Sequence, residues 1–89
     1  MSSVDDFVAR IEGTCGAEKD VIVVFKYDKK EEAVARIRKN AEIKNSIAGI
    51  IFEMVFRDKS FRVYASGKAI FRSIKDKKEL YDLLAGLLL

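Results

Sequence analysis

Residues 48–73 read AGIIFEMVFRDKSFRVYASGKAIFRS, and this stretch decides the fold. Residues 48–56 are rich in β-branched and aromatic side chains, and residues 61–65 and 68–73 alternate between apolar and polar ones, which is typical of strands. The polar residues 57–60 supply a turn after the first of these segments, and Ser66 with Gly67 supplies a second. The sequence therefore predicts a three-strand antiparallel meander.

The segments on either side of the meander predict a central strand and two helices. Residues 20–27 contain an uninterrupted apolar, β-branched run, so this strand should be covered on both faces. Residues 28–44 begin with a capping pattern and carry apolar side chains at helical spacing. Asp76 opens a similar pattern before a leucine stripe that must bury against the sheet, formed by Leu80, Leu83, Leu84, Leu87 and Leu88.

At the N-terminus, Val4, Phe7, Val8 and Ile11 have the spacing of a short helix that stops at Gly13. The expected order is helix, strand, helix, three strands and helix. This order predicts an α+β fold in which helices pack on one face of a curved antiparallel sheet of about four to five strands. Residues 1–89 fit one domain, with residues 1–16 as an N-terminal helical extension.

The composition argues against an enzyme. The chain has no histidine and one cysteine, Cys15, which excludes serine and cysteine triads and the common zinc sites. Asp5 and Asp6 lie at a predicted helix start, where carboxylates stabilise the helix dipole. No glycine-rich loop is long enough to hold a pyrophosphate. We expect a binding module without a catalytic residue, metal or cofactor.

The same composition predicts where the protein works. A lone cysteine cannot form an internal disulfide, and the N-terminus lacks the basic and apolar regions of a secretion signal. No apolar run reaches the roughly 20 residues that span a bilayer. We expect a soluble cytoplasmic protein with no membrane contact. The absence of His, Trp, Pro and Gln, with 35% charged residues, favours a thermophile as the source.

Charge is unevenly placed along the chain. The formal net charge is +3, yet residues 57–79 hold eight Lys and Arg against three Asp and Glu, a local charge of +5. Such a basic segment either attracts a polyanion or forms an ordinary solvent-exposed surface.

Alternation sorts the sheet residues onto two faces. One face collects the phenylalanines and is the expected core face, with these members: Val21, Val23, Phe25, Ile50, Phe52, Met54, Phe56, Phe61, Val63, Ala69 and Phe71. The other face is more apolar than a solvated face, because it carries these side chains: Ile22, Val24, Ile51, Val55, Tyr64 and Ile70. We expect this second face to be covered by the N-terminal helix, by a second subunit or by a nucleic acid.

A family resemblance rests on residues 61–71 (FRVYASGKAIF), followed by residues 73–80 and a long helix. Along the chain, an apolar strand with an aromatic residue is followed by Ser-Gly-Lys, a second apolar strand, a basic turn and the last helix. This order resembles one repeat of the TATA-box-binding protein family, over about three quarters of the chain. The resemblance implies a half-saddle fold, and pairing of two copies as a homodimer is expected to rebuild the two-repeat saddle.

The resemblance also implies a nucleic-acid-binding face. It places Tyr64 and Ile47 at wedging positions and Ile22, Ile70 and Arg72 against the minor groove. Asp20 stands where the family repeats have an asparagine, and its charge is expected to weaken DNA binding. Further residues of this face or its rim complete the expected site: Lys26, Ile51, Arg62 and Lys68.

Two functions follow as expectations. The first is a homodimeric nucleic-acid-binding module, for DNA or RNA, with low sequence specificity and a role akin to transcription or nucleic-acid processing. The alternative is a protein-assembly subunit that uses the same face or the sheet edge for a protein partner. Residues 25–33 carry a similarity to the small dimerising subunit of the KEOPS tRNA-modification complex, which is consistent with this alternative.

Overall fold

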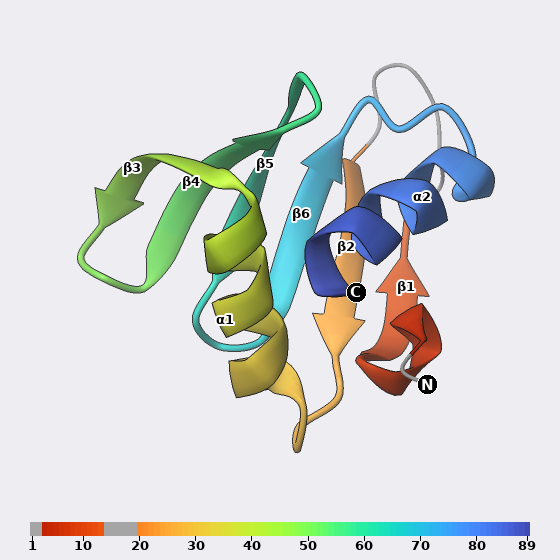
Figure 1. The fold of residues 1–89 in the computed structure, drawn as a ribbon, viewed down its shortest axis with the longest axis horizontal. Helices are drawn as coiled ribbons and strands as arrows, with labels where there is room; N and C mark the ends of the chain where they lie inside the picture. Colours follow the sequence, from red (N-terminus) through yellow and green to blue (C-terminus); the bar gives the residue numbers. More distant parts are fainter. Residues whose placement is uncertain (1–2, 14–19) are drawn as a thin grey trace.

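The computed structural model describes residues 3–13 and 20–89, so the expectation for Cys15 lies outside the described residues. The fold is α+β, as predicted (Figure 1). The elements are η1, a one-turn 3-10 helix (Val4–Asp6), β1 (Val8–Glu12), β2 (Asp20–Phe25), α1 (Lys30–Asn40), β3 (Glu42–Ile47), β4 (Ile51–Phe56), β5 (Lys59–Tyr64), β6 (Lys68–Arg72) and α2 (Lys77–Leu88).

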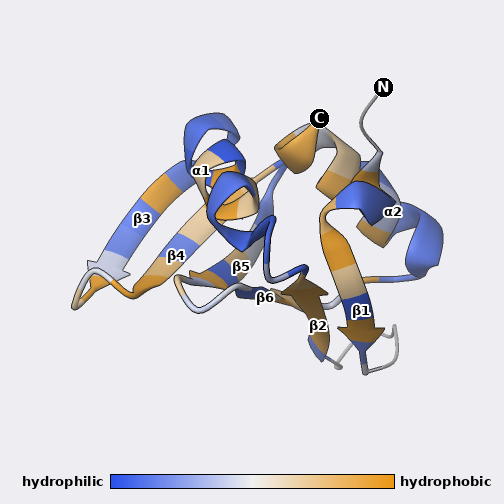
Figure 2. Cartoon of the chain, turned by 90° about the horizontal axis from the view of Figure 1, so that it is seen from below, coloured by the Kyte–Doolittle hydropathy of each residue, from blue (hydrophilic) through white to orange (hydrophobic). Residues whose placement is uncertain are grey.

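The strands of the described chain form one antiparallel sheet of six, in the order β1-β2-β6-β5-β4-β3. This exceeds the expected four to five strands, because the sequence pattern predicted neither of the edge strands, β1 and β3. Both α-helices lie on the same side of the sheet, and no helix of the described residues lies on the other side (Figure 2). None of these helices is long and apolar enough to span a membrane.

The N-terminal helix predicted over residues 4–12 is wrong. Only η1 is helical, and β1 then pairs with β2. A bulge between Val8 and Arg10 shifts the alternation, so that Val8 lies opposite Phe25 and Ile11 opposite Val23. Val8 and Ile11 therefore share the core side although they are three residues apart, which gives the spacing of a helix.

The helix predicted over residues 28–44 is too long. It ends at Asn40, and Ala41 is already extended before β3. All six residues of β3 are exposed, so this strand has no buried side to create an alternating pattern. The cap expected from Asp28 is also absent, because Lys29 occupies the N-cap position and makes no capping hydrogen bond through its side chain.

The meander and the last helix are confirmed. β4 begins at Ile51 because Ala48 and Gly49 have positive φ and form a turn. The same turn leaves Ile50 57% exposed, so its expected place in the core is wrong. Asp76 caps α2 as predicted, since its Oδ1 accepts a hydrogen bond of 2.9 Å from the backbone N–H of Glu79.

The core lies between the two helices and one face of the sheet. The Phe61 and Phe71 rings sit directly opposite on β5 and β6 and stack with their centroids 4.8 Å apart. The leucine stripe of α2 is buried as predicted. The phenylalanine-rich side is therefore the core face, with these buried sheet residues: Val8, Val21, Val23, Phe25, Phe52, Met54, Phe61, Val63, Ala69 and Phe71.

Candidate functional site

The side of the sheet without helices is named the open face. Because paired residues on neighbouring strands point to the same side, the strand register assigns its members. They are Arg10 and Glu12 from β1; Asp20, Ile22 and Val24 from β2; Lys68, Ile70 and Arg72 from β6; Ser60, Arg62 and Tyr64 from β5; Ile51, Glu53 and Val55 from β4; and Glu42, Asn45 and Ile47 from β3.

Several apolar side chains lie in the middle of the open face, next to Arg62 and Lys68. Ile22 on β2 pairs with Ile70 on β6, and Ile51 on β4 pairs with Tyr64 on β5. These four side chains, together with Val24 and Val55, are only half-buried. The N-terminal segment does not cover them as a helix, because β1 extends the sheet sideways and η1 packs against α2. Within the described residues, the chain leaves this apolar surface open.

Most of the predicted site residues come together on this face: Ile22, Ile51, Arg62, Tyr64, Lys68, Ile70 and Arg72. Ile47 lies beside Ile51 at the end of the exposed edge strand β3. Lys26 stands apart, because β2 ends at Phe25 and the Lys26 backbone N–H donates to the Phe7 carbonyl oxygen at 2.8 Å.

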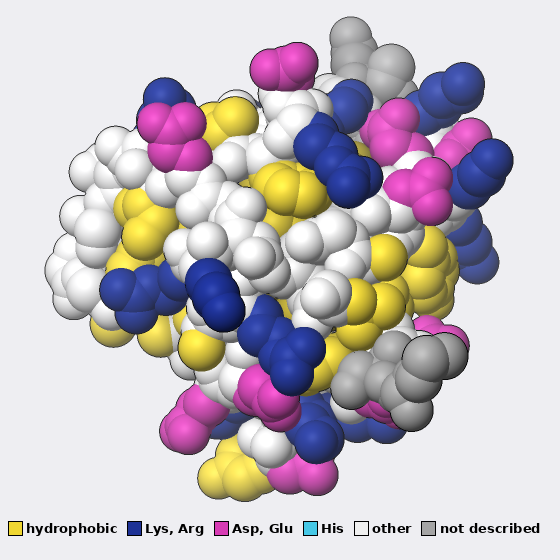
Figure 3. Space-filling view, in the orientation of Figure 1, with side chains coloured by type: hydrophobic (Ala, Val, Ile, Leu, Met, Phe, Trp, Pro, Cys, Tyr) yellow, Lys and Arg dark blue, Asp and Glu magenta, His cyan; other side chains and the backbone are white. Residues whose placement is uncertain are grey.

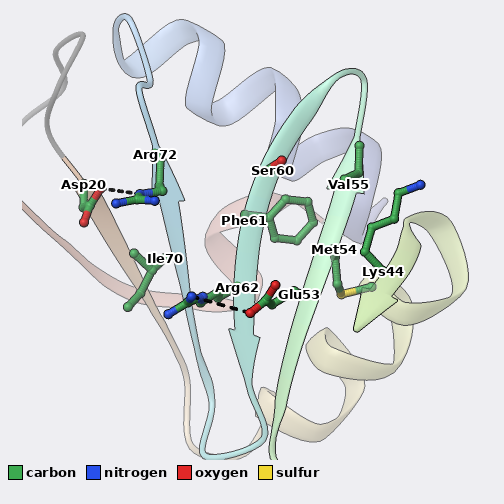
Figure 4. Close-up of a pocket in the computed structure, with 10 residues that line it drawn as sticks. All are labelled: Asp20, Lys44, Glu53, Met54, Val55, Ser60, Phe61, Arg62, Ile70 and Arg72. Atoms are coloured by element: carbon green, nitrogen blue, oxygen red, sulfur yellow. Dashed lines mark ion pairs between the residues drawn. The ribbon is translucent and has the colours of Figure 1, made fainter. Parts of the chain in front are cut away.

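Each arginine of the open face is paired with a carboxylate. Arg62 Nη2 lies 3.5 Å from Glu53 Oε1, and Arg72 Nε lies 3.5 Å from Asp20 Oδ1 (Figure 4). Near its two edges, two tighter pairs join Arg10 to Glu12 at 2.7 Å and Lys44 to Glu42 at 3.2 Å. The two arginines of the predicted site, Arg62 and Arg72, therefore each have a carboxylate beside them.

The carboxylates Glu12, Glu42 and Glu53 and the cations Arg10 and Lys44 of these pairs were absent from the predicted site. Arg10 and Glu12 could not be placed there, because residues 4–12 were interpreted as a helix. Glu42 fell in the predicted helix for a similar reason. Glu53 is two residues from Ile51, so alternation places both on the same face, but its position opposite Arg62 depends on the exact register of β4 and β5.

Lys68 differs from the arginines, because its Nζ lies 5.0 Å from the centroid of the Tyr64 ring. The two residues are cross-strand partners at the Ser66–Gly67 turn. A cation over an aromatic ring is attracted by the ring's negative face. Tyr64 is thus held by its neighbour but keeps part of its ring accessible.

A hollow of about 300 Å³ opens on this face where β5 and β6 part beyond the Phe61–Phe71 pair (Figure 4). Its walls combine the two arginine–carboxylate pairs with the apolar side chains of Val55 and Ile70. Within residues 3–13 and 20–89, no group of three or more His, Cys, Asp or Glu could hold a metal ion. The hollow is large enough for one side chain or a small ligand group.

The basic segment 57–79 does not form a single surface. Arg62, Lys68 and Arg72 point to the open face, whereas other cations of the segment line a groove of about 370 Å³ at the start of α2. This groove contains four cations and three carboxylates: Arg57, Lys59, Lys75, Lys78, Asp76, Glu79 and Asp82. The helix side of the molecule likewise shows both signs close together (Figure 3).

Comparison of the sequence with protein-family models and with curated proteins, and of the fold with solved structures, gives no match.

Proposed function

We propose that the protein is a non-enzymatic assembly module that docks onto another protein through its open face. One observation carries the proposal: half-buried apolar side chains lie on a face whose arginines are each paired with a carboxylate of the same face. Protein interfaces combine an apolar centre with a polar, charge-matched rim. A polyanion surface instead needs cations that are free to replace counterions.

The size of the face supports docking of a protein. Six strands about 4.8 Å apart and about five residues long give a surface of roughly 29 by 17 Å. That is close to 500 Å² before the relief of the side chains is counted. A partner that covered the whole face would bury an area near the lower limit of specific interfaces.

The hollow gives the face a place for an anchoring side chain. Binding energy at interfaces concentrates in a few side chains that fill desolvated pockets. Val55 and Ile70 offer apolar walls, and the paired arginines Arg62 and Arg72 offer donors at the rim. An aromatic side chain with a polar tip fits this combination.

The proposal predicts that a charge in the middle of the face abolishes assembly. Ile70→Asp replaces an apolar side chain in the middle of the open face by a carboxylate, and Ala35→Asp adds the same charge on the exposed, opposite side of the molecule as the matched control. Chemical crosslinking inside its own cells, followed by size measurement of the tagged protein in nuclease-treated extracts, should show a complex for the wild type and Ala35→Asp. Ile70→Asp should run as a free chain.

A wild-type chain that is free in the extract, or an Ile70→Asp variant that keeps its complex, would contradict the proposal. Circular dichroism and thermal melts of each purified variant separate lost docking from lost folding.

A second candidate, nucleic-acid binding, is favoured by the accessible Tyr64 ring beside Lys68. An aromatic ring between cations can stack on or wedge against bases. In this proposal the sheet is the half-saddle of a TATA-box-binding-protein-like repeat, and Arg62 and Arg72 exchange Glu53 and Asp20 for phosphates. Titration of labelled 20-mer DNA and RNA at several salt concentrations tests it. Absence of binding at low salt would remove this candidate, and salt-sensitive binding lost in Tyr64→Ala would favour it.

A further inference from the structure

We propose that the open face docks onto a second copy of this chain, with a two-fold axis that runs along the strands between β2 and β6. The inference rests on the proposed function and names its partner. It comes from the charged residues of four strands, β1, β2, β6 and β5. These strands lie side by side in the sheet (Figure 1).

The register aligns the side chains of these strands in three rows across the open face. One row reads Glu12, Ile22, Ile70 and Arg62. The next reads Arg10, Val24, Lys68 and Tyr64. The third contains Asp20 beside Arg72.

A rotation of 180° about the proposed axis keeps each row in place and reverses its order. β2 then faces β6 of the second copy, and β1 faces β5. After this rotation, each row of one copy faces the same row of the second copy in reversed order, and the facing side chains are complementary. The facing pairs are Glu12 with Arg62, Ile22 with Ile70, Arg10 with Tyr64, Val24 with Lys68, and Asp20 with Arg72.

The pairing brings no like charges together. Its centre is the apolar pair of Ile22 and Ile70, repeated by symmetry on both sides of the axis. Acid meets base twice in each copy, and Arg10 meets an aromatic ring. Val24 meets Lys68, whose aliphatic stem can lie along an apolar surface.

The geometry of packed sheets is compatible with this arrangement. Facing sheets lie about 10 Å apart and are rotated by about 30°. Side chains on β1 and β5 lie about 7 Å from the axis, so this rotation displaces their contacts by about 4 Å. Arginine and glutamate side chains are long enough to span that shift.

Four strands offer a patch of about 19 by 17 Å, which is small for an interface. We therefore expect a weak dimer with a dissociation constant in the micromolar range. β4 and β3 remain outside the paired surface, together with Glu53 and the exposed edge residues Ile43 and Ile47.

The pair formed by Glu12 and Arg62 gives a sharp test. Within one chain, three strand spacings separate these residues, or about 14 Å, which is too far for an ion pair. Their intramolecular partners are Arg10 and Glu53 respectively. Compensation between Glu12 and Arg62 therefore has to act between two copies.

Sedimentation equilibrium from about 10 µM to 1 mM should show dimerisation of the wild type. Glu12→Arg and Arg62→Glu each create two like-charge contacts per dimer, so each variant alone should associate at least about tenfold more weakly. An equimolar mixture of the two variants restores opposite charges at both contacts. The mixture should therefore form a heterodimer with near wild-type affinity, and the double variant should recover as a homodimer.

A wild-type chain that is monomeric at 1 mM would overturn the inference. So would single variants that associate like the wild type, or a mixture that does not recover. If the purified chain is monomeric while Ile70→Asp still dissolves a complex in extracts, assembly through the open face stands and self-pairing fails. If neither effect appears, both proposals fail.

Discussion

Phe71→Ala is expected to lower the free energy of unfolding by about 3–5 kcal/mol. The Phe71 side chain is 1% exposed and stacks on Phe61 in the layer between the sheet and the helices. Alanine would lose this burial and leave a cavity, because the neighbouring strands are held by their hydrogen-bonded register. Denaturant unfolding followed by circular dichroism measures the loss.

Ile70→Ala is the matched control, since Ile70 is the preceding residue on the same strand and points to the open face. Ile70 is already half-exposed, so its truncation should cost only about 1 kcal/mol. Equal losses for the two variants, or a larger loss for Ile70→Ala, would mean that the two faces of the sheet are assigned the wrong way round.

Gly67→Ala is expected to destabilise the protein by about 2–4 kcal/mol. Gly67 has a φ of 109°, a region that side chains with a Cβ rarely adopt, and an added Cβ would lie 2.9 Å from Lys30 Cβ. Its carbonyl oxygen also accepts a hydrogen bond of 2.9 Å from the Phe25 N–H. This turn joins β5 to β6 and so fixes the positions of Tyr64 and Lys68.

Gly49→Ala separates the two causes of that loss. Gly49 also has a positive φ, of 71°, but an added Cβ would meet nothing within 4 Å. Its substitution should cost about 1–2 kcal/mol, the ordinary penalty for a left-handed residue. Thermal melts that show equal losses at both positions would exclude a contribution from the contact with Lys30.

The sequence is sufficient to predict the elements whose side chains carry a clear burial pattern. Residues 61–65 and 68–73 alternate, and the leucines of residues 80–88 recur at helical spacing, so the meander and α2 were correctly predicted. β1 was missed because its bulge imitates a helical period, and β3 because none of its residues is buried. Both failures lie at the edges of the sheet, where burial imposes the weakest pattern.

The sequence could predict which residues share the open face, but not which of their charges pair. Alternation alone assigned Ile22, Arg62 and Ile70 to one face. A four-residue turn at 57–60 would have put Phe61 opposite Phe56 and Arg62 opposite Val55. The actual two-residue turn, at Arg57 and Asp58 with positive φ, brings Arg62 opposite Glu53. The length of the turn therefore decides which side chain lies opposite Arg62.

The partner of Arg72 could not be predicted from local sequence either. Its carboxylate comes from Asp20, on a strand far away in the chain, and depends on the pairing of β2 with β6. Asp20 was expected to weaken contact with a phosphate by repulsion. In the structure the same carboxylate lies beside Arg72, a cation that was expected to lie against the minor groove.

Site-specific photo-crosslinking in the protein's own cells tests the central claim most directly. A photoreactive phenylalanine derivative at position 70 lies in the middle of the open face, and the same derivative at position 35 lies exposed on α1. We expect discrete protein adducts from position 70 and none of these from position 35, with nuclease treatment leaving the adducts unchanged. Adducts of nucleic acid at position 70, or the same protein adducts from both positions, would contradict protein docking through the open face.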